Sequence, residues 1–226
     1  MSLIKDHIGE LYYRSNSIKF DDKGEGFRLS AHLDNPSLAP SPYYLHYPKP
    51  GEPGYALMPE MIKYCGMALF KLAVDLGIDA NKIAAVPSGA DPIAEAMARY
   101  RPEFPNNLLR FEKHQRNSET SFTLRNGTFD EHEALTVIDD HTSGGRNKRL
   151  FQIAAEGYGL NVTHMLNIVD REQGAEAVMA DHGIVMRSLF TITELFEYGL
   201  AERHITQDTY DNAMSYKQNN AIPTDR

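Results

Sequence analysis

From residue 59 onward, apolar residues alternate between helical spacing and short continuous runs. Segments at helical spacing predict amphipathic helices, and short apolar runs bounded by turn residues predict buried strands. In chain order the pattern predicts helix 59–76, strand 83–87, helix 92–100, strand 107–111, strand 134–138, helix 147–156, strand 162–169, helix 175–182, strand 184–189 and helix 193–198. Such alternation is typical of the α/β class, with a central, mainly parallel sheet flanked by helices.

Four segments depart from this alternation. Residues 2–14 carry apolar residues at helical spacing and predict an amphipathic helix. Residues 20–56 are rich in proline and glycine, so we expect a loop-rich hood or binding segment with one extended piece at 41–47. Residues 112–131 are polar and aperiodic, which predicts a long mobile loop. The polar residues after Thr206 predict a tail that packs weakly or not at all.

The length of 226 residues, without a linker-like stretch, predicts one domain: N-terminal helix and hood 1–56, α/β core 57–205 and tail 206–226. A formal net charge of -8 argues against a general nucleic-acid binder. The single cysteine, Cys65, fits a reducing compartment. No apolar run approaches the roughly 18 to 20 residues that span a bilayer, and the first residues lack the apolar core of a signal peptide. We therefore expect a cytoplasmic protein without a membrane partner.

The most informative stretch follows the predicted strand 134–138, where Asp139 and Asp140 precede Thr142-Ser143-Gly144-Gly145 and a predicted helix. In open α/β sheets, ligands bind at the carboxyl ends of the strands. A glycine turn entering a helix offers backbone N–H groups to a phosphate, and the two hydroxyls add donors. The acids would repel phosphate, so they should face sugar hydroxyls or a divalent metal. The other interpretation is that the acids only start the turn and cap the helix.

Apolar strand, acid pair, Thr/Ser, Gly-Gly and helix resemble the diphosphoribosyl-binding motif of the type I phosphoribosyltransferases. The resemblance implies that the acids bind the ribose hydroxyls and that the turn holds the 5-phosphate. Only His141 separates Asp140 from Thr142, one residue fewer than in the family pattern. If the glycine turn sets the register, Ile138 and Asp139 occupy the acid positions; if the acids set it, the loop is one residue short.

A second stretch, Val169-Asp-Arg171-Glu-Gln-Gly174, ends the next predicted strand, and Ser188-Leu-Phe-Thr191 ends the one after it. Both are similar to segments of the orotate phosphoribosyltransferases, and this resemblance implies that Arg171 binds orotate. A guanidinium can pair with a planar carboxylate through two parallel hydrogen bonds. An isolated Asp-Arg pair would otherwise suggest a strand-end salt bridge.

Three weaker stretches extend the resemblance. Val86 to Ala94 is similar to the family's pyrophosphate loop and implies that Ser88, Gly89 and Ala90 bind pyrophosphate. Gly26 to Ser30 and Ser41 to Leu45 are similar to the family's hood segments, in which Tyr43 and Tyr44 would stack on a base and the usual lysine falls at Ser30. The family's catalytic loop would place Arg110 in substrate binding and Lys113 and His114 in catalysis, together with Asp139 and Asp140. By default, such a loop is a solvated charge cluster.

The resemblance implies transfer of ribose 5-phosphate from 5-phosphoribosyl diphosphate to orotate in pyrimidine synthesis, by a homodimer using Mg²⁺. The metal would be held mainly by substrate oxygens near Asp139 and Asp140, without dedicated side-chain ligands. Two alternatives remain open: transfer to another base, and a non-catalytic regulatory protein that binds the diphosphate. A receiver domain also uses acids at a strand end, but it would place them near the start of the chain.

Overall fold

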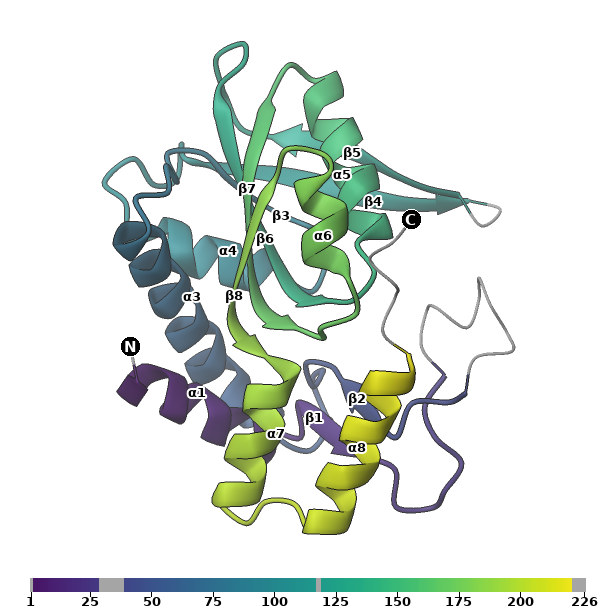
Figure 1. Cartoon of the computed structure of the whole chain (residues 1–226). Helices are drawn as coiled ribbons and strands as arrows, with labels where there is room; N and C mark the ends of the chain where they lie inside the picture. Colours follow the sequence, from purple (N-terminus) through teal and green to yellow (C-terminus); the bar gives the residue numbers. More distant parts are fainter. Residues whose placement is uncertain (1, 29–38, 117–118, 221–226) are drawn as a thin grey trace.

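The computed structural model describes residues 2–28, 39–116 and 119–220 (Figure 1). Its centre is a six-stranded sheet in the order β5-β4-β3-β6-β7-β8. The strands are β3 (Ile83–Ala85), β4 (Leu108–Arg116), β5 (Glu119–Asn126), β6 (Ala134–Thr142), β7 (Asn161–Asp170) and β8 (Val185–Thr191). All neighbouring pairs are parallel except β4 with β5. The predicted α/β class with a mainly parallel sheet is confirmed.

Helices cover both faces of the sheet (Figure 1). The helices are α1 (Ser2–Arg14), α3 (Met58–Asp75), α4 (Asp91–Ala98), α5 (Arg146–Gly157), α6 (Ala175–Ala180), α7 (Ile192–Ala201) and α8 (Gln207–Asn219), with a 3-10 turn η1 (Tyr55–Leu57). One apolar core joins α1, α3, α4 and α7 to one face, and a second joins α5 and α6 to the other. The continuous apolar runs of β3 and β7 follow from this arrangement, because a parallel strand covered on both faces has no solvated side.

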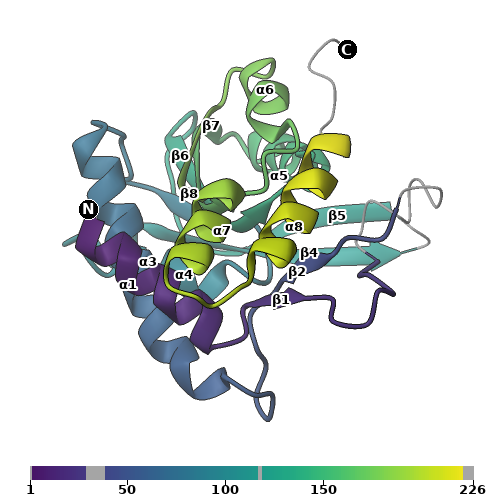
Figure 2. The same ribbon diagram turned by 60° about the horizontal axis from the view of Figure 1, so that its bottom comes forward.

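A small second sheet lies below the main one, beside α7 and α8 (Figure 2). It consists of β1 (Ile18–Phe20) paired antiparallel with β2 (Tyr43–Leu45). The extended piece expected at 41–47 contains β2, whereas β1 was not predicted, since three residues are too short for a period-2 signal. The hood expected from the N-terminal segment thus includes this two-stranded sheet; Ser30 lies outside the described residues.

The loop predicted over residues 112–131 was wrong for much of its length. Strand β4 continues to Arg116 and pairs antiparallel with β5, so the two strands form a hairpin that projects from the sheet edge (Figure 1). At the root of the hairpin, Phe111 and Phe122 pack against Phe151 of α5, with ring centroids 4.8 and 5.3 Å apart. The outer half has both faces in solvent, so its strands lack the apolar alternation that identifies a half-buried strand.

The weakly packed tail predicted after Thr206 was also wrong. Residues 207–219 form α8, with Ala213 fully buried. Tyr216 packs edge-on against Tyr43 of the hood, and Lys217 donates a 3.1 Å hydrogen bond to Glu172. Tyr210 and Met214 also pack against the core beside Ala213, but the polar residues between them hid this short apolar stripe.

Within the described ranges, no helix is long and apolar enough to cross a membrane.

Candidate active site

Strand β6 does not end at Ile138 as predicted but continues through the acid pair to Thr142. Pairing with β7 extends it, since Thr142 lies opposite Asp170. Successive side chains of a strand point to opposite faces. Asp139 and Asp140 therefore cannot both face one ligand in the same way.

Asp139 is buried in an internal ion pair. Its Oδ2 lies 2.6 Å from Lys148 Nζ and accepts a 3.1 Å hydrogen bond from the Thr142 hydroxyl. Both charged side chains are almost fully enclosed, with exposed fractions of 5% for Asp139 and 11% for Lys148. Burial raises the pKa of Asp139, and the Lys148 ammonium opposes that rise. The contacts of Asp139 are thus made with the protein itself.

Asp140 lies between two loops and keeps 26% of its side chain exposed. Its Oδ1 accepts a 2.7 Å hydrogen bond from the His141 N–H, while Oδ2 points at Gly89 in the turn after β3. A Cβ built on Gly89 would overlap that oxygen. The structure therefore brings Asp140 against the Ser88-Gly89-Ala90 turn.

The turn after β6 leaves a helix terminus available to an anion. Gly145 adopts a left-handed conformation (φ 82°) as the N-cap of α5, and no side chain caps this helix. Ser143 and Gly144 are half-buried. The Thr142 hydroxyl donates to Asp139, so it does not point at an anion as predicted. First-turn amides and the Ser143 hydroxyl are then the donors that suit a phosphate here.

Arg171 is tied to the same turn. Its backbone N–H donates a 2.8 Å hydrogen bond to the Thr142 carbonyl. The side chain is buried (8% exposed), yet Nε and Nη2 have no hydrogen-bond partner among the described residues. The alternative strand-end salt bridge is not formed with Glu172, which pairs with Lys217. Because buried donors are rarely left unpaired, this guanidinium is suited to an anionic ligand.

The two tyrosines predicted to stack on a base take different positions. Tyr43 is fully buried, and the Arg171 guanidinium lies over its ring at 4.9 Å from the centroid. Its edge contact with Phe196 fixes the ring. Tyr44 is 39% exposed and stacks with Phe27 and His46 on the other side of β2. Tyr43 therefore supports Arg171 from below by a cation–π contact.

A cleft of about 350 Å³ separates the turn after β3 from strand β4. We call it the loop–hairpin cleft; its walls are Pro87, Ser88 and Asp91 on one side and Phe111, Glu112, Lys113 and Gln115 on the other. Ser88 and Lys113, both predicted site residues, thus share one cavity. The Glu112 carboxylate pairs with Arg125 of β5, so Asp91 and Lys113 are the charged groups that this lining offers to a ligand. One ammonium cannot neutralise a diphosphate, which would therefore need an accompanying cation.

His114 and Arg110 do not join this cleft. His114 follows Lys113 on a strand and so points to the opposite face, where Nε2 lies 2.8 Å from the Thr123 hydroxyl of β5. Arg110 donates a 2.6 Å hydrogen bond to Glu95 of α4. A flexible loop would have let all three side chains face one ligand, whereas the hairpin separates them.

Asp91, at the start of α4, gives the cleft a pH-dependent effect on stability. Burial raises the pKa of its carboxyl to about 6, with Arg110 opposing the rise. The folded protein therefore favours the protonated acid, and stability falls as pH rises from about 4 through 6. Asp91→Asn should remove this loss. At pH 7.5 its free energy of unfolding should exceed that of the parent by less than ~1 kcal/mol, because the group is partly solvated.

Thermal unfolding of both proteins between pH 4 and 8 measures this effect. The advantage of Asp91→Asn should grow from nearly zero at the acid end and level off above about pH 7. An advantage that is the same at every pH would contradict the assignment.

Sequence reasoning expected Lys148 to face the cleft and did not foresee its ion pair with Asp139. A cation within the first turn of a helix opposes the helix dipole, and Lys148 is the third residue of α5. That unfavourable position was the available signal that a nearby buried acid compensates the positive charge of Lys148.

Comparison with curated proteins adds independent evidence. No family model matches the chain. Orotate phosphoribosyltransferase of Pyrococcus furiosus is 30% identical over 139 residues, which are 62% of this chain and 74% of that protein. The chain belongs to the orotate phosphoribosyltransferase family. The protein of the same name from Chlamydia felis is 27% identical over 162 residues.

Solved structures agree with family membership at the level of the fold. Orotate phosphoribosyltransferase from Aeropyrum pernix superposes with a TM-score of 0.64 at 18% identity, covering 84% of this chain and 96% of that one. UMP synthase of Leishmania donovani gives 0.74 at 19% identity, covering 95% of this chain. This chain spans 42% of the UMP synthase chain. The type I phosphoribosyltransferase fold expected from the motifs is confirmed.

Proposed function

We propose that this orotate phosphoribosyltransferase family member transfers ribose 5-phosphate from 5-phosphoribosyl diphosphate to orotate, giving orotidine 5-monophosphate and diphosphate. The observation that carries the proposal is the buried Arg171 guanidinium. Two of its nitrogens lack hydrogen-bond partners among the described residues, and its backbone N–H is bonded to the Thr142 carbonyl before the glycine turn. A planar base carboxylate supplies two parallel acceptors for such a group. The short link from Arg171 to Thr142 sets the base site beside the ribose phosphate site.

The remaining contacts follow from the geometry. Ser143, Gly144 and Gly145 would hold the 5-phosphate at the α5 terminus, and Asp140 would accept hydrogen bonds from the ribose hydroxyls. Asp139 would act indirectly, by holding Lys148. Ser88, Gly89 and Ala90 would bind the diphosphate from one wall of the loop–hairpin cleft, and Lys113 from the other.

Catalysis then rests on positioning and charge. As diphosphate leaves, the anomeric carbon becomes cation-like. The enzyme accelerates the transfer by holding the base nitrogen in line with the breaking bond, on the opposite side of this carbon. Lys113 is placed to stabilise the charge that develops on the leaving group. The enclosed setting of Arg171 fixes the orotate orientation and leaves little room for water beside the base.

Magnesium fits this site as a companion of the substrate. Among the described residues, no group of three His, Cys, Asp or Glu side chains could hold a metal. Mg²⁺ would therefore be held mainly by oxygens of the substrate, with the Asp140 and Asp91 carboxylates as hard oxygen groups beside the Ser88-Gly89-Ala90 turn. When bound with the diphosphate, Mg²⁺ would neutralise its charge next to these acids. A homodimer and a cytoplasmic location complete the proposal, the latter in keeping with the free, buried thiol of Cys65.

The decisive experiment is orotate consumption by the purified protein with 5-phosphoribosyl diphosphate and Mg²⁺. We expect turnover that requires all three components and gives orotidine 5-monophosphate. Turnover with another base but not with orotate would overturn the substrate assignment alone.

A regulatory protein that binds the diphosphate without turnover is the second candidate. The separation of Arg110 and His114 from the cleft favours it, since the family's loop residues are engaged elsewhere. Calorimetric binding of 5-phosphoribosyl diphosphate without turnover on any base would select this candidate.

Gly89→Ala tests the contact between the two loops. The added methyl group would overlap Asp140 Oδ2 and displace the carboxylate, so we expect kcat/KM for the diphosphate to fall about 10- to 100-fold, the effect of losing one charged hydrogen bond. Gly157→Ala, at a glycine with open space around its Cβ position and without a left-handed backbone, controls for glycine replacement itself. Unchanged kinetics in Gly89→Ala would show that Asp140 does not need this position.

A further inference from the structure

Two hydrogen bonds and one electrostatic contact connect the hood to Asp140. Tyr47 Oη lies 3.1 Å from Tyr12 Oη, and Tyr12 Oη lies 3.0 Å from His141 Nε2. On the other side of the ring, His141 Nδ1 lies 3.6 Å from Asp140 Oδ2. We call Tyr47, Tyr12 and His141 the tyrosine–histidine row. It joins α1 and the segment after β2 to the carboxylate that faces Gly89.

The direction of these hydrogen bonds follows from protonation. Burial raises the pKa of both tyrosines well above the usual value, so both keep their protons. The two ring nitrogens of His141 face different groups: Nδ1 faces the Asp140 carboxylate, which can only accept, and Nε2 faces the Tyr12 hydroxyl, which can donate. A proton on Nε2 would leave a lone pair on Nδ1 facing the Asp140 carboxylate, which is repulsive. The favourable arrangement has Nδ1–H facing Asp140, Tyr12 donating to Nε2, and Tyr47 donating to Tyr12.

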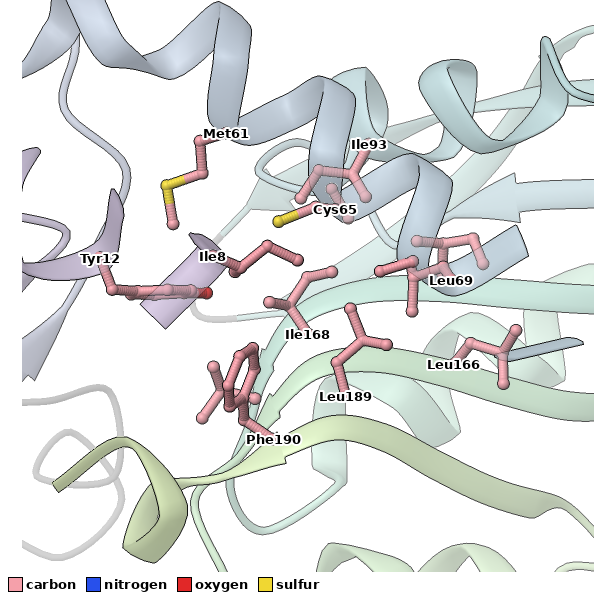
Figure 3. Packing of buried hydrophobic residues seen from close by; sticks show 14 of the residues in the cluster. Ile8, Tyr12, Met61, Cys65, Leu69, Ile93, Leu166, Ile168, Leu189 and Phe190 are labelled. Atoms are coloured by element: carbon pink, nitrogen blue, oxygen red, sulfur yellow. The ribbon is translucent and has the colours of Figure 1, made fainter. Parts of the chain in front are cut away.

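The row is held rigidly. The Tyr12 ring lies in the apolar core beside Ile8, Met61 and Phe190 (Figure 3). The His141 ring packs against Tyr47 at a centroid distance of 5.1 Å. Because close-packed rings cannot turn without displacing their neighbours, the Nδ1–H keeps a fixed direction toward Asp140.

We infer that the tyrosine–histidine row positions the Asp140 carboxylate for the ribose hydroxyls. This inference rests on the proposed function, because it assigns Asp140 to ribose. Tyr12, Tyr47 and His141 are positioning residues that act through Asp140. Their loss should weaken binding of the ribosyl diphosphate while leaving orotate recognition at Arg171 unchanged.

Tyr12→Phe tests the inference, since it removes one hydroxyl far from the ligand and keeps the ring. Tyr13→Phe on the same helix is the matched control, because the Tyr13 hydroxyl donates a 2.8 Å hydrogen bond to the Leu195 carbonyl outside the row. Calorimetry with 5-phosphoribosyl diphosphate and Mg²⁺ should show Kd raised about 3- to 10-fold in Tyr12→Phe, the effect of one hydrogen bond. Kd in Tyr13→Phe should equal that of the parent, and KM for orotate should be unchanged in both.

Asp140→Asn supplies the second measurement. If Tyr12 acts through Asp140, adding Tyr12→Phe to Asp140→Asn should cause no further loss of affinity. Equal Kd values for parent and Tyr12→Phe, or fully additive losses in the double variant, would overturn the inference. Failure of the parent to bind the diphosphate would instead count against the proposed function. Calorimetry well below the unfolding temperature of each variant ensures that a change in Kd does not arise from partial unfolding.

Discussion

Arg171→Met should lose most of its activity on orotate and yet unfold at a temperature no lower than that of the parent. Truncating one partner of a buried, hydrogen-bonded charge pair costs roughly 2 to 5 kcal/mol, so kcat/KM for orotate should fall about 30- to 5,000-fold. In the free protein the same guanidinium is buried, and the part of the chain that the structure describes offers no hydrogen-bond partner to Nε or Nη2. Replacing such a group by an apolar side chain of similar length is neutral or stabilising.

The combination of these two outcomes makes the test specific. A purely structural arginine would lower activity and stability together. Steady-state kinetics and thermal unfolding should be compared with Arg187→Met, whose guanidinium is exposed and pairs with Glu176 on the surface. That control should resemble the parent in both measurements. Arg171→Lys should recover only part of the activity, since an ammonium keeps the charge without the planar fork. A destabilised Arg171→Met with normal orotate kinetics would refute the assignment.

Replacement by asparagine should affect different properties at the two adjacent acids: activity at Asp140 and stability at Asp139. Asp140→Asn removes a half-exposed charge, so stability should change little while kcat/KM for the ribosyl diphosphate falls about 10- to 150-fold, corresponding to roughly 1.5 to 3 kcal/mol for a charged hydrogen bond. Asp139→Asn leaves the buried Lys148 without its counter-charge. Breaking a buried ion pair in this way costs about 3 to 5 kcal/mol, so the unfolding temperature should drop by roughly 6 to 20 °C.

Lys148→Met provides the matched rescue. In the double variant Asp139→Asn with Lys148→Met, no uncompensated charge remains, and most of the lost stability should return. Thermal unfolding measures the rescue, and kinetics at a temperature where every variant is folded measures the effect on activity. If Asp139→Asn proved stable but inactive and Asp140→Asn proved active, the roles of the two acids would have to be exchanged.

The predicted core elements agree with the structure within a few residues. Burial on both sheet faces requires apolar residues at regular spacing in these elements, and that spacing is visible in the sequence. The hairpin β4–β5 and helix α8 were missed for the opposite reason. In the outer hairpin both faces meet solvent, so its strands carry no apolar alternation. Helix α8 packs through the short stripe Tyr210, Ala213 and Met214, which is one turn long and lies among polar residues, although packing stabilises the whole helix.

The sequence by itself determined the class of fold, the family and the order of the binding segments along the chain. These properties depend on apolar periodicity and on short contiguous motifs, such as the acid pair with its glycine turn and the segment around Arg171. Only the tertiary structure decided how neighbouring residues divide their tasks. Because β6 pairs with β7 through both acids, Asp139 and Asp140 lie in one strand and point to opposite faces. Lys148, from the following helix, forms an ion pair with the buried acid, Asp139. Such assignments depend on residues that meet only in the folded chain.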